Sequence, residues 1–187
     1  MEVEIAGDSR RSELLRRAHD RKPDATSILE VGCGSGSVLA SASALFPSAT
    51  LVGIDIVASK IERARRRAPH IRWHTAPVER LPFSDQSFDL VLAGMTLHHW
   101  KSKQKGLTEI ARVLTADGVI VIVDPIVAGP LTHGWVNRLA ERLDGGSFTQ
   151  PEEFAQIIEH AGLKIIEQGF VPQSLKTVSV YVLGKRL

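Results

Sequence analysis

Residues 28–37 read Ile-Leu-Glu-Val-Gly-Cys-Gly-Ser-Gly-Ser, and this is the most informative stretch of the chain. An apolar run, typical of a buried strand, leads into three alternate glycines, and a helix-forming segment follows. Glycines let the chain turn sharply and leave no side chain between the backbone and a ligand. The next helix directs its free amide donors and the positive end of its dipole toward the same place. The stretch therefore predicts a strand, loop and helix that bind a ligand rich in hydrogen-bond acceptors.

The spacing of the glycines distinguishes two ligand classes. Gly32, Gly34 and Gly36 form GxGxG, with Glu30 two positions before the first glycine. The dinucleotide fingerprint GxGxxG would need a Gly or Ala at the position of Ser37. The pattern (Asp/Glu)-x-Gly-x-Gly-x-Gly resembles the first motif of the class I S-adenosylmethionine-dependent methyltransferases, whose loop faces the methionine half of the cofactor. From these residues alone, a dinucleotide is the alternative ligand.

Length and composition are those of one ordinary globular unit. The chain has 187 residues, of which 43% are hydrophobic and 24% charged, and a formal net charge of +2. This length builds one sizeable core, so we expect a single domain over residues 1–187. No apolar run reaches the roughly 20 residues of a membrane span, and the N-terminus lacks a secretory signal. We therefore expect a cytoplasmic protein without a membrane partner, and its oligomeric state stays open.

Strand-like and helix-like segments alternate along the chain, which is typical of an α/β layer fold. We expect helices at 9–21 (within an N-terminal segment 1–24), 37–46, 58–68, 103–114 and 151–161, and strands at 27–32, 50–55, 70–75, 88–93, 119–123, 163–170 and 177–183. Several of these strands are apolar throughout, as in a parallel sheet that is covered on both faces. No helix separates the last two strands, so they should form a hairpin with the final strand antiparallel.

This arrangement resembles the class I methyltransferase fold over essentially the whole chain. The resemblance implies a Rossmann-like three-layer α/β sandwich with a seven-stranded, mostly parallel sheet and an antiparallel last strand. Residues 78–91, with the sequence VERLPFSDQSFDLV, are similar to the family stretch A-E-x-L-P-F-x-D-x-S-F-D-x-V. The resemblance further implies S-adenosylmethionine as the cofactor and S-adenosylhomocysteine as its product.

The same resemblance implies a cofactor site in the turns after four strands. Asp55 stands where a carboxylate accepts the ribose hydroxyls, and a helix N-cap is its alternative role. Pro77 and Val78 stand at the adenine positions, where Pro77 replaces a family carboxylate. Ala93 and Gly94 are small enough for the backbone to approach the methionine amine. The expected cofactor-binding residues are Glu30, Gly32, Cys33, Gly34, Gly36, Asp55, Ile56, Pro77, Val78, Ala93 and Gly94.

The acceptor end of the site follows the fourth strand. His98 and His99 are similar to the L-H-H of the ubiquinone/menaquinone biosynthesis group, and adjacent side chains project differently. We expect His99 to face the acceptor as a catalytic base, with a structural histidine at a helix start as the alternative. His133 and Asp124 are further candidates for the base. Segment 125–150 interrupts the scaffold and is the expected acceptor-binding insertion. No third ligand has a metal-site spacing, so we expect no metal.

These expectations combine into methyl transfer to an O, N or C atom of a small molecule. An RNA or protein methyltransferase is the first alternative, favoured only by basic runs such as Arg65–Arg67. Aromatic residues make up only 5% of the chain, which favours a solvated basic face over a nucleic-acid partner. The Asn/Asp-Pro-Pro-Tyr/Phe motif of amine-directed nucleic-acid enzymes is missing after the fourth strand. A noncatalytic binding module that has kept the fold is the second alternative.

Overall fold

A computed structural model describes residues 9–125, 151–171 and 179–186. The expected insertion 125–150 and the candidate base His133 lie outside the described residues, except for Pro125. None of the helices in these ranges is both long and apolar enough to cross a membrane. In chain order the elements are α1 (Ser9–Arg21), β1 (Ser27–Val31), α2 (Ser37–Leu45), β2 (Thr50–Asp55), α3 (Ala58–Arg67), β3 (Arg72–Thr75), β4 (Phe88–Gly94), the 3-10 turn η1 (Leu97–His99), α4 (Lys103–Val113), β5 (Leu114–Pro125), α6 (Pro151–His160), β6 (Leu163–Val171) and β7 (Ser179–Arg186).

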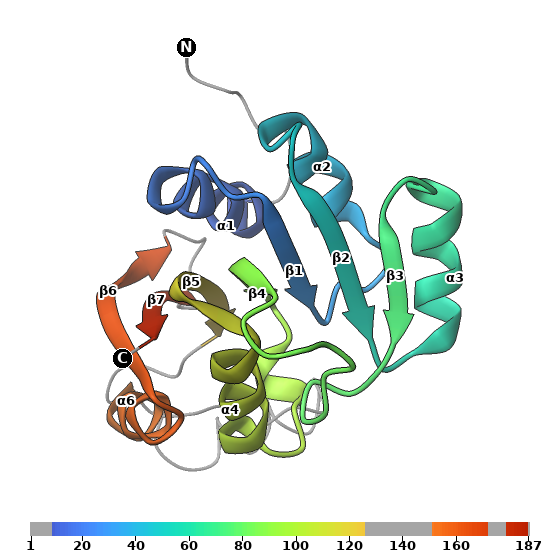
Figure 1. Ribbon diagram of the computed structural model, residues 1–187. Coiled ribbons are helices and arrows are strands. Elements are labelled where there is room, and N and C mark those ends of the chain that lie inside the picture. Colours follow the sequence, from blue (N-terminus) through green and yellow to red (C-terminus); the bar gives the residue numbers. More distant parts are fainter. Residues whose placement is uncertain (1–8, 126–150, 172–178, 187) are drawn as a thin grey trace.

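The strands form one seven-stranded sheet with the order β3-β2-β1-β4-β5-β7-β6. Neighbouring strands from β3 to β5 are parallel, whereas β7 runs antiparallel to both β5 and β6 (Figure 1). The chain moves outward from β1 in one direction and from β4 in the other, so the crossovers diverge between these two strands. Ligands of open α/β sheets bind in the crevice at the carboxyl ends of such strands.

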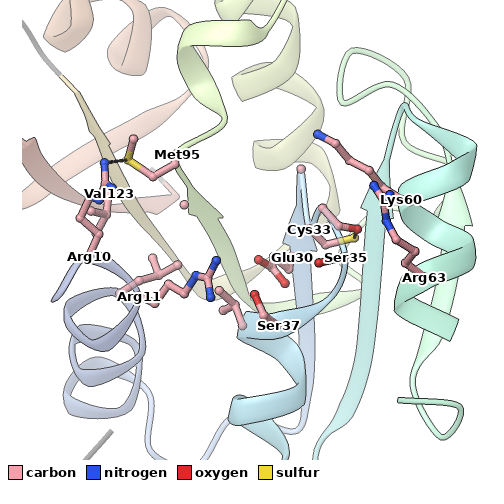
Figure 2. Close-up of a pocket in the computed structure, with 15 residues that line it drawn as sticks. Arg10, Arg11, Glu30, Cys33, Ser35, Ser37, Lys60, Arg63, Met95 and Val123 are labelled. Carbon is pink, nitrogen blue, oxygen red and sulfur yellow. Dashed lines mark hydrogen bonds between the residues drawn. The ribbon is translucent and has the colours of Figure 1, made fainter. Parts of the chain in front are cut away.

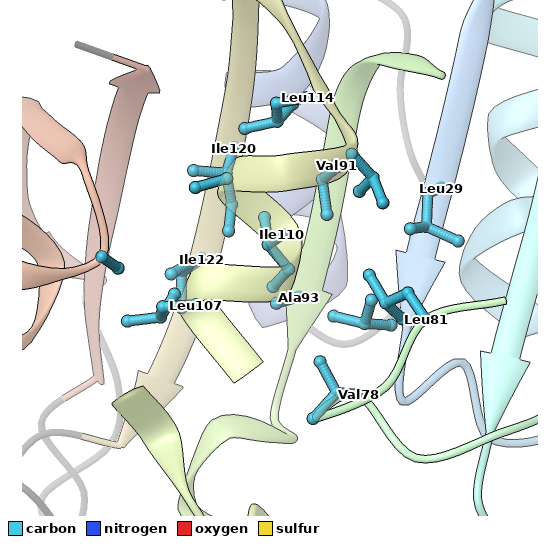
Figure 3. Packing of buried hydrophobic residues seen from close by; sticks show 14 of the residues in the cluster. Leu29, Val78, Leu81, Val91, Ala93, Leu107, Ile110, Leu114, Ile120 and Ile122 are labelled. Carbon is cyan, nitrogen blue, oxygen red and sulfur yellow. The ribbon is translucent and has the colours of Figure 1, made fainter. Parts of the chain in front are cut away.

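Period-two alternation along the strands buries both faces of the sheet. Leu29, Val91 and Ile120 point into one core, which α4 and α6 cover (Figure 3). Ile28 and Leu90 belong to the opposite core, whose helical residues come from α1, α2 and α3. The sheet is therefore the middle of three layers, which confirms the expected Rossmann-like α/β class.

Strand β5 begins earlier than the sequence predicts. Leu114 is expected to end a helix, but its φ of −69° and ψ of 139° are extended, and it pairs with Phe88. The register then jumps, because Leu90 pairs with Val119. The turn-forming residues between Leu114 and Val119 are thus accommodated as an irregularity inside one long strand, where the sequence indicates a loop.

Candidate functional site

The glycine loop lies directly against the turn that follows β4. Gly32, Gly34 and Gly36 have φ angles of 67°, 55° and 77°, a region that L-residues rarely adopt. A Cβ atom at Gly32 would lie 1.9 Å from Oγ1 of Thr96, so no side chain fits there. A Cβ at Gly36 would lie 2.5 Å from the ring of Trp73. Gly32 therefore permits close approach to β4, and Gly36 permits packing beneath the loop.

Glu30, in β1, is a buried carboxyl group with an incomplete set of partners. Its side chain is 2% exposed, and a backbone amide of Leu39 in α2 donates to it. Within the described residues Oε2 accepts no hydrogen bond. Burial raises the pKa of Glu30 to about 8, and attraction to Arg11 offsets this rise only in part. A buried acceptor without a partner, beside a cavity, fits the ammonium group of the expected cofactor.

Asp55, the last residue of β2, connects the loop to α3. Its Oδ2 accepts a hydrogen bond from the Gly34 amide at 2.9 Å, and its Oδ1 accepts one from the Val57 amide at 2.9 Å. Val57 is itself the N-cap of α3, so the alternative role of Asp55 as that N-cap is wrong. Each carboxylate oxygen has further lone pairs that can accept ribose hydroxyls. The side chain reaches this position because Asp55 ends a strand beside the loop.

Two adjoining cavities meet above the loop. The first has a volume of about 430 Å³, and Figure 2 shows its lining from α1, the loop, α3 and the end of β4. The second has a volume of about 470 Å³. Gly32, Lys60 and Met95 line both cavities. The first cavity is also lined by four expected cofactor residues, which are Glu30, Cys33, Gly34 and Gly94. The second is lined by four others, which are Asp55, Ile56, Pro77 and Val78. The two remaining expected residues, Gly36 and Ala93, line neither cavity.

The second cavity has an apolar edge. Ile56 is 58% exposed, and Val57 beside it is also among the exposed large hydrophobic residues. Pro77 and the buried Val78 border the same space. An aromatic base that enters this cavity would cover the exposed side chain of Ile56.

Cys33 shows no features of a nucleophile. It is 5% exposed, and burial raises the pKa of its thiol far above the ordinary value. The carboxylates of Glu30 and Asp55 raise that pKa further. Cys33 is therefore a small buried side chain of the loop. The described ranges contain no group of three His, Cys, Asp or Glu that could hold a metal ion.

The two adjacent histidines have different environments. His99 is exposed and lines the second cavity, whereas His98 is 3% exposed. Nδ1 of His98 lies 2.8 Å from Oδ1 of Asp124, and Oδ2 of Asp124 accepts the amides of Thr96 and Leu97. Asp124 is thus buried and committed to the turn after β4, and it lines neither cavity. The sequence analysis did not identify this pair. His98 follows β4, Asp124 lies near the end of β5, and these two strands are neighbours in the sheet.

Two residues that no motif identifies also border the cavities. Met95 adopts a φ of 53°, which is rare for a residue with a side chain. Arg10, from α1, donates to Sδ of Met95 at 3.5 Å (Figure 2). The N-terminal helix therefore contributes to the site, which its amphipathic pattern does not indicate.

Comparison with known proteins gives consistent matches. A family model described as "Methyltransferase domain" matches residues 29–122. A demethylmenaquinone methyltransferase of Chlorobaculum parvum is 30% identical over 179 residues, which cover 84% of this chain and 73% of that protein. The structure of YcgJ from Bacillus subtilis has a TM-score of 0.78 at 19% identity and covers 95% of this chain and 98% of its own. A geranyl diphosphate C-methyltransferase from Streptomyces coelicolor, solved with S-adenosyl-L-homocysteine, has a TM-score of 0.81 at 14% identity, covering 94% and 78%.

Proposed function

This chain belongs to the class I S-adenosylmethionine-dependent methyltransferases, and we propose that its acceptor is a small molecule. Membership of this family makes it an enzyme, so the alternative of a noncatalytic module is set aside. The proposal is supported by the relative from Chlorobaculum parvum, whose name gives it a demethylmenaquinone acceptor. The single observation that carries the proposal is the pair of adjoining cavities at the carboxyl end of the sheet. One accommodates the methionine half of the cofactor, and the other contains the candidate base.

We propose that the turns after β1 and β4 hold the methionine half of the cofactor. Oε2 of Glu30 is a buried acceptor whose natural partner is the cofactor ammonium group. Gly32, Cys33 and Gly34 offer backbone without bulky side chains at the same level. Gly94, at the end of β4, lines this cavity from the other side. Gly36 and Ala93 act indirectly in this arrangement, by allowing the loop and strand to pack.

We propose that Asp55 and the apolar edge bind the nucleoside half. Asp55 keeps its backbone hydrogen bonds and accepts the ribose hydroxyls through its remaining lone pairs. Ile56 and Val78 both line this cavity and provide apolar contact for the adenine. Pro77 cannot supply the carboxylate that the family places there. The methylene stem of Lys60 lines the same cavity and can pack beside the ring while its charge reaches water.

The cofactor carries an activated methyl group, so the protein needs mainly to align the acceptor with it. Holding two reactants in line can supply about 7 to 11 kcal/mol. We propose that His99, which lines the second cavity, removes the proton where the acceptor is a hydroxyl or an acidic carbon. A positioned base adds about 10² to 10⁴ in rate. His98 is not assigned this role, because it is 3% exposed and lines neither cavity.

The test is a methyl-transfer assay that reports S-adenosylhomocysteine formation. The full chain is offered a panel of quinols, phenols, carboxylic acids and prenyl phosphates, with total RNA and total protein in parallel. We expect turnover with at least one class of small molecule and background rates with RNA and protein. His99→Gln should slow turnover of a hydroxyl acceptor while leaving affinity for S-adenosylhomocysteine unchanged. Methyl incorporation into RNA or protein alone would overturn the proposal in favour of the first alternative.

A further inference from the structure

Only the first two residues of the stretch 78–91 border a cavity. Val78 and Glu79 line the second cavity, whereas the later residues of the stretch line neither. Several of these later residues instead form hydrogen bonds with side chains of α4 (Lys103–Val113). The stretch therefore connects the adenine end of the cofactor site with the C-terminal end of α4.

Arg112, in the last turn of α4, uses its whole guanidinium group to hold this stretch. Its Nη1 donates to the carbonyl oxygen of Phe83 and to Oδ1 of Asp85, each at 2.8 Å. Its Nη2 donates to the carbonyl oxygen of Leu81 at 3.1 Å and to Oε2 of Glu109 at 2.9 Å. Its Nε donates to Oε1 of Glu109 at 2.8 Å. A guanidinium has five N–H donors in a rigid plane, and here each of them has an acceptor.

Glu109 binds the same stretch from one helical turn earlier. Its Oε2 accepts the Leu81 amide at 2.8 Å, so α4 holds both the amide and the carbonyl of Leu81. The two parallel hydrogen bonds from Arg112 fix the Glu109 carboxylate in place. Bidentate pairs within a network are the ion pairs that contribute measurably to stability. We call Glu109 and Arg112 the α4 clamp.

The start of the stretch also packs on α4. Oε1 of Glu79 accepts the amide of Ser102, the N-cap of α4, at 3.2 Å. A Cβ at Gly106 of α4 would lie 3.2 Å from the side chain of Val78, so Val78 contacts the helix closely. Val78 and Leu81 both belong to the core that α4 covers (Figure 3). The helix thus determines where the adenine edge of the second cavity lies.

The adenine end depends on this placement more than the ribose end does. Pro77 offers no carboxylate to the adenine, so the contacts that remain come from apolar side chains and from the backbone at Val78. Dispersion contacts weaken steeply when a gap of even 0.5 to 1 Å opens. A turn, in which the Arg80 amide donates to the Pro77 carbonyl at 3.2 Å, joins these residues directly to Leu81. A shift of Leu81 would therefore also move Val78.

We propose that Glu109 and Arg112 are positioning residues for the cofactor, which set the affinity for its nucleoside half by holding residues 78–85 against α4. Neither residue lines a cavity, so both act through Val78 and Glu79. This inference rests on the proposed placement of the nucleoside half in the second cavity. It makes α4, which contributes no side chain to either cavity, part of the cofactor-binding machinery.

The experiment measures the affinity of the full chain for two ligands by calorimetry. S-adenosylhomocysteine contains both halves of the cofactor, and 5′-methylthioadenosine contains the nucleoside without the amino acid. The variants are Arg112→Gln, which removes the charge and most donors, and Arg112→Lys, which keeps the charge. Titrations are run at a temperature at which circular dichroism shows each variant to be folded, so that Arg112→Lys still tests the clamp if Arg112→Gln does not fold.

Ile158→Ala is the control for a general loss of stability. Ile158, in α6, is 1% exposed within the core that α4 covers, and it takes part in none of the hydrogen bonds of the clamp. The substitution therefore leaves a cavity in that core without releasing residues 78–85. We expect its affinities for both ligands to equal those of the parent.

We expect Arg112→Gln to weaken both ligands by the same factor, about three- to tenfold, which corresponds to one lost hydrogen bond at the nucleoside end. Arg112→Lys should weaken both by about twofold or more, because three donors on a flexible stem replace only part of the fork. Parent-like affinities in the folded Arg112 variants would overturn the inference. It would equally be overturned if S-adenosylhomocysteine were weakened and 5′-methylthioadenosine were not.

The outcomes also separate this inference from the proposed function. If only RNA or protein is methylated while Arg112→Gln weakens both ligands, the proposed acceptor fails and the positioning role stands. If Asp55→Asn weakens both ligands while Arg112→Gln weakens neither, the nucleoside placement stands and the positioning role fails.

Discussion

The buried carboxyl group of Glu30 leads to a prediction about stability. Its pKa rises from an ordinary value of 4.5 to about 8 in the folded chain, because burial disfavours the charged form. The folded state therefore binds the proton more tightly than the unfolded state between these two values. The contribution of Glu30 to the free energy of unfolding is therefore most favourable in acid and decreases as the pH rises toward 8. Above that pH it stays constant, because the carboxyl group is then ionised in both states. Glu30→Gln replaces the carboxyl group by a neutral side chain of the same shape and should remove this loss.

The magnitude follows from this shift in the pKa of Glu30. Between pH 5 and pH 8 the parent loses about 1.36 kcal/mol per pH unit, so the variant should gain about 4 kcal/mol relative to the parent. At pH 5 itself the two proteins should differ by less than about 1 kcal/mol, because the folded parent holds the proton there. Urea unfolding of both ligand-free proteins at pH 5, 6.5 and 8.5 gives the two free-energy curves to compare.

Glu109→Gln is the matched control because it has the opposite sign. Hydrogen bonds from Arg112 lower the pKa of Glu109, so its ionised form stabilises the fold. This variant should be less stable than the parent at neutral pH, and the difference should shrink in acid as the parent carboxylate takes up its proton. If the gap between Glu30→Gln and the parent stays constant from pH 5 to pH 8.5, the reasoning about Glu30 is wrong.

Three further predictions test the loop and the turn after β4. Gly32→Ala should lower the free energy of unfolding in urea by at least about 2 kcal/mol, because the added Cβ would lie 1.9 Å from the side chain of Thr96. Gly34→Ala should lower it by about 1 kcal/mol, because the added Cβ meets no atom within 4 Å and only the positive φ is unfavourable. Asp55→Asn should weaken S-adenosylhomocysteine at least tenfold by calorimetry, and unchanged affinity would refute its ribose role. His98→Ala should cost about 2 to 3 kcal/mol in thermal or urea unfolding, because it removes the hydrogen bond to Oδ1 of the buried Asp124 and leaves a cavity. His99→Ala should stay within about 0.5 kcal/mol, and equal effects would contradict the assignment of the two histidines.

Sequence reasoning predicts those features of this fold that depend on short stretches of chain. The glycine loop, the apolar strands and the antiparallel hairpin each follow from a local pattern, and the structure has all three. The beginning of β5 could not be predicted, because Thr115 and Gly118 are typical of a turn and local propensity indicates a loop there. Pairing of Leu114 with Phe88 on the neighbouring strand overrides that propensity.

The site shows the same division between local and long-range information. The motif residues Glu30, Gly32 and Asp55 meet at one cavity system, as their places in the chain imply. The pairing of His98 with Asp124 depends on β4 and β5 lying side by side, which no motif encodes. The sequence therefore favours His99 as the base and leaves Asp124 and His133 as further candidates. Burial separates His99 from Asp124, since the exposed His99 lines a cavity and the buried Asp124 lines neither, while His133 lies outside the described residues.

Two unfavourable features lie at the carboxyl edge of this sheet, and we expect cofactor binding to offset their cost. Glu30 has a buried oxygen without a partner in the described chain, and Met95, which lines the same cavity, holds a φ of 53°. Each feature lowers the stability of the ligand-free protein, since an unpaired buried group or a strained residue costs about 1 to 3 kcal/mol. Such features are typical of functional sites, so the ligand-free enzyme should be markedly less stable than its complex with cofactor.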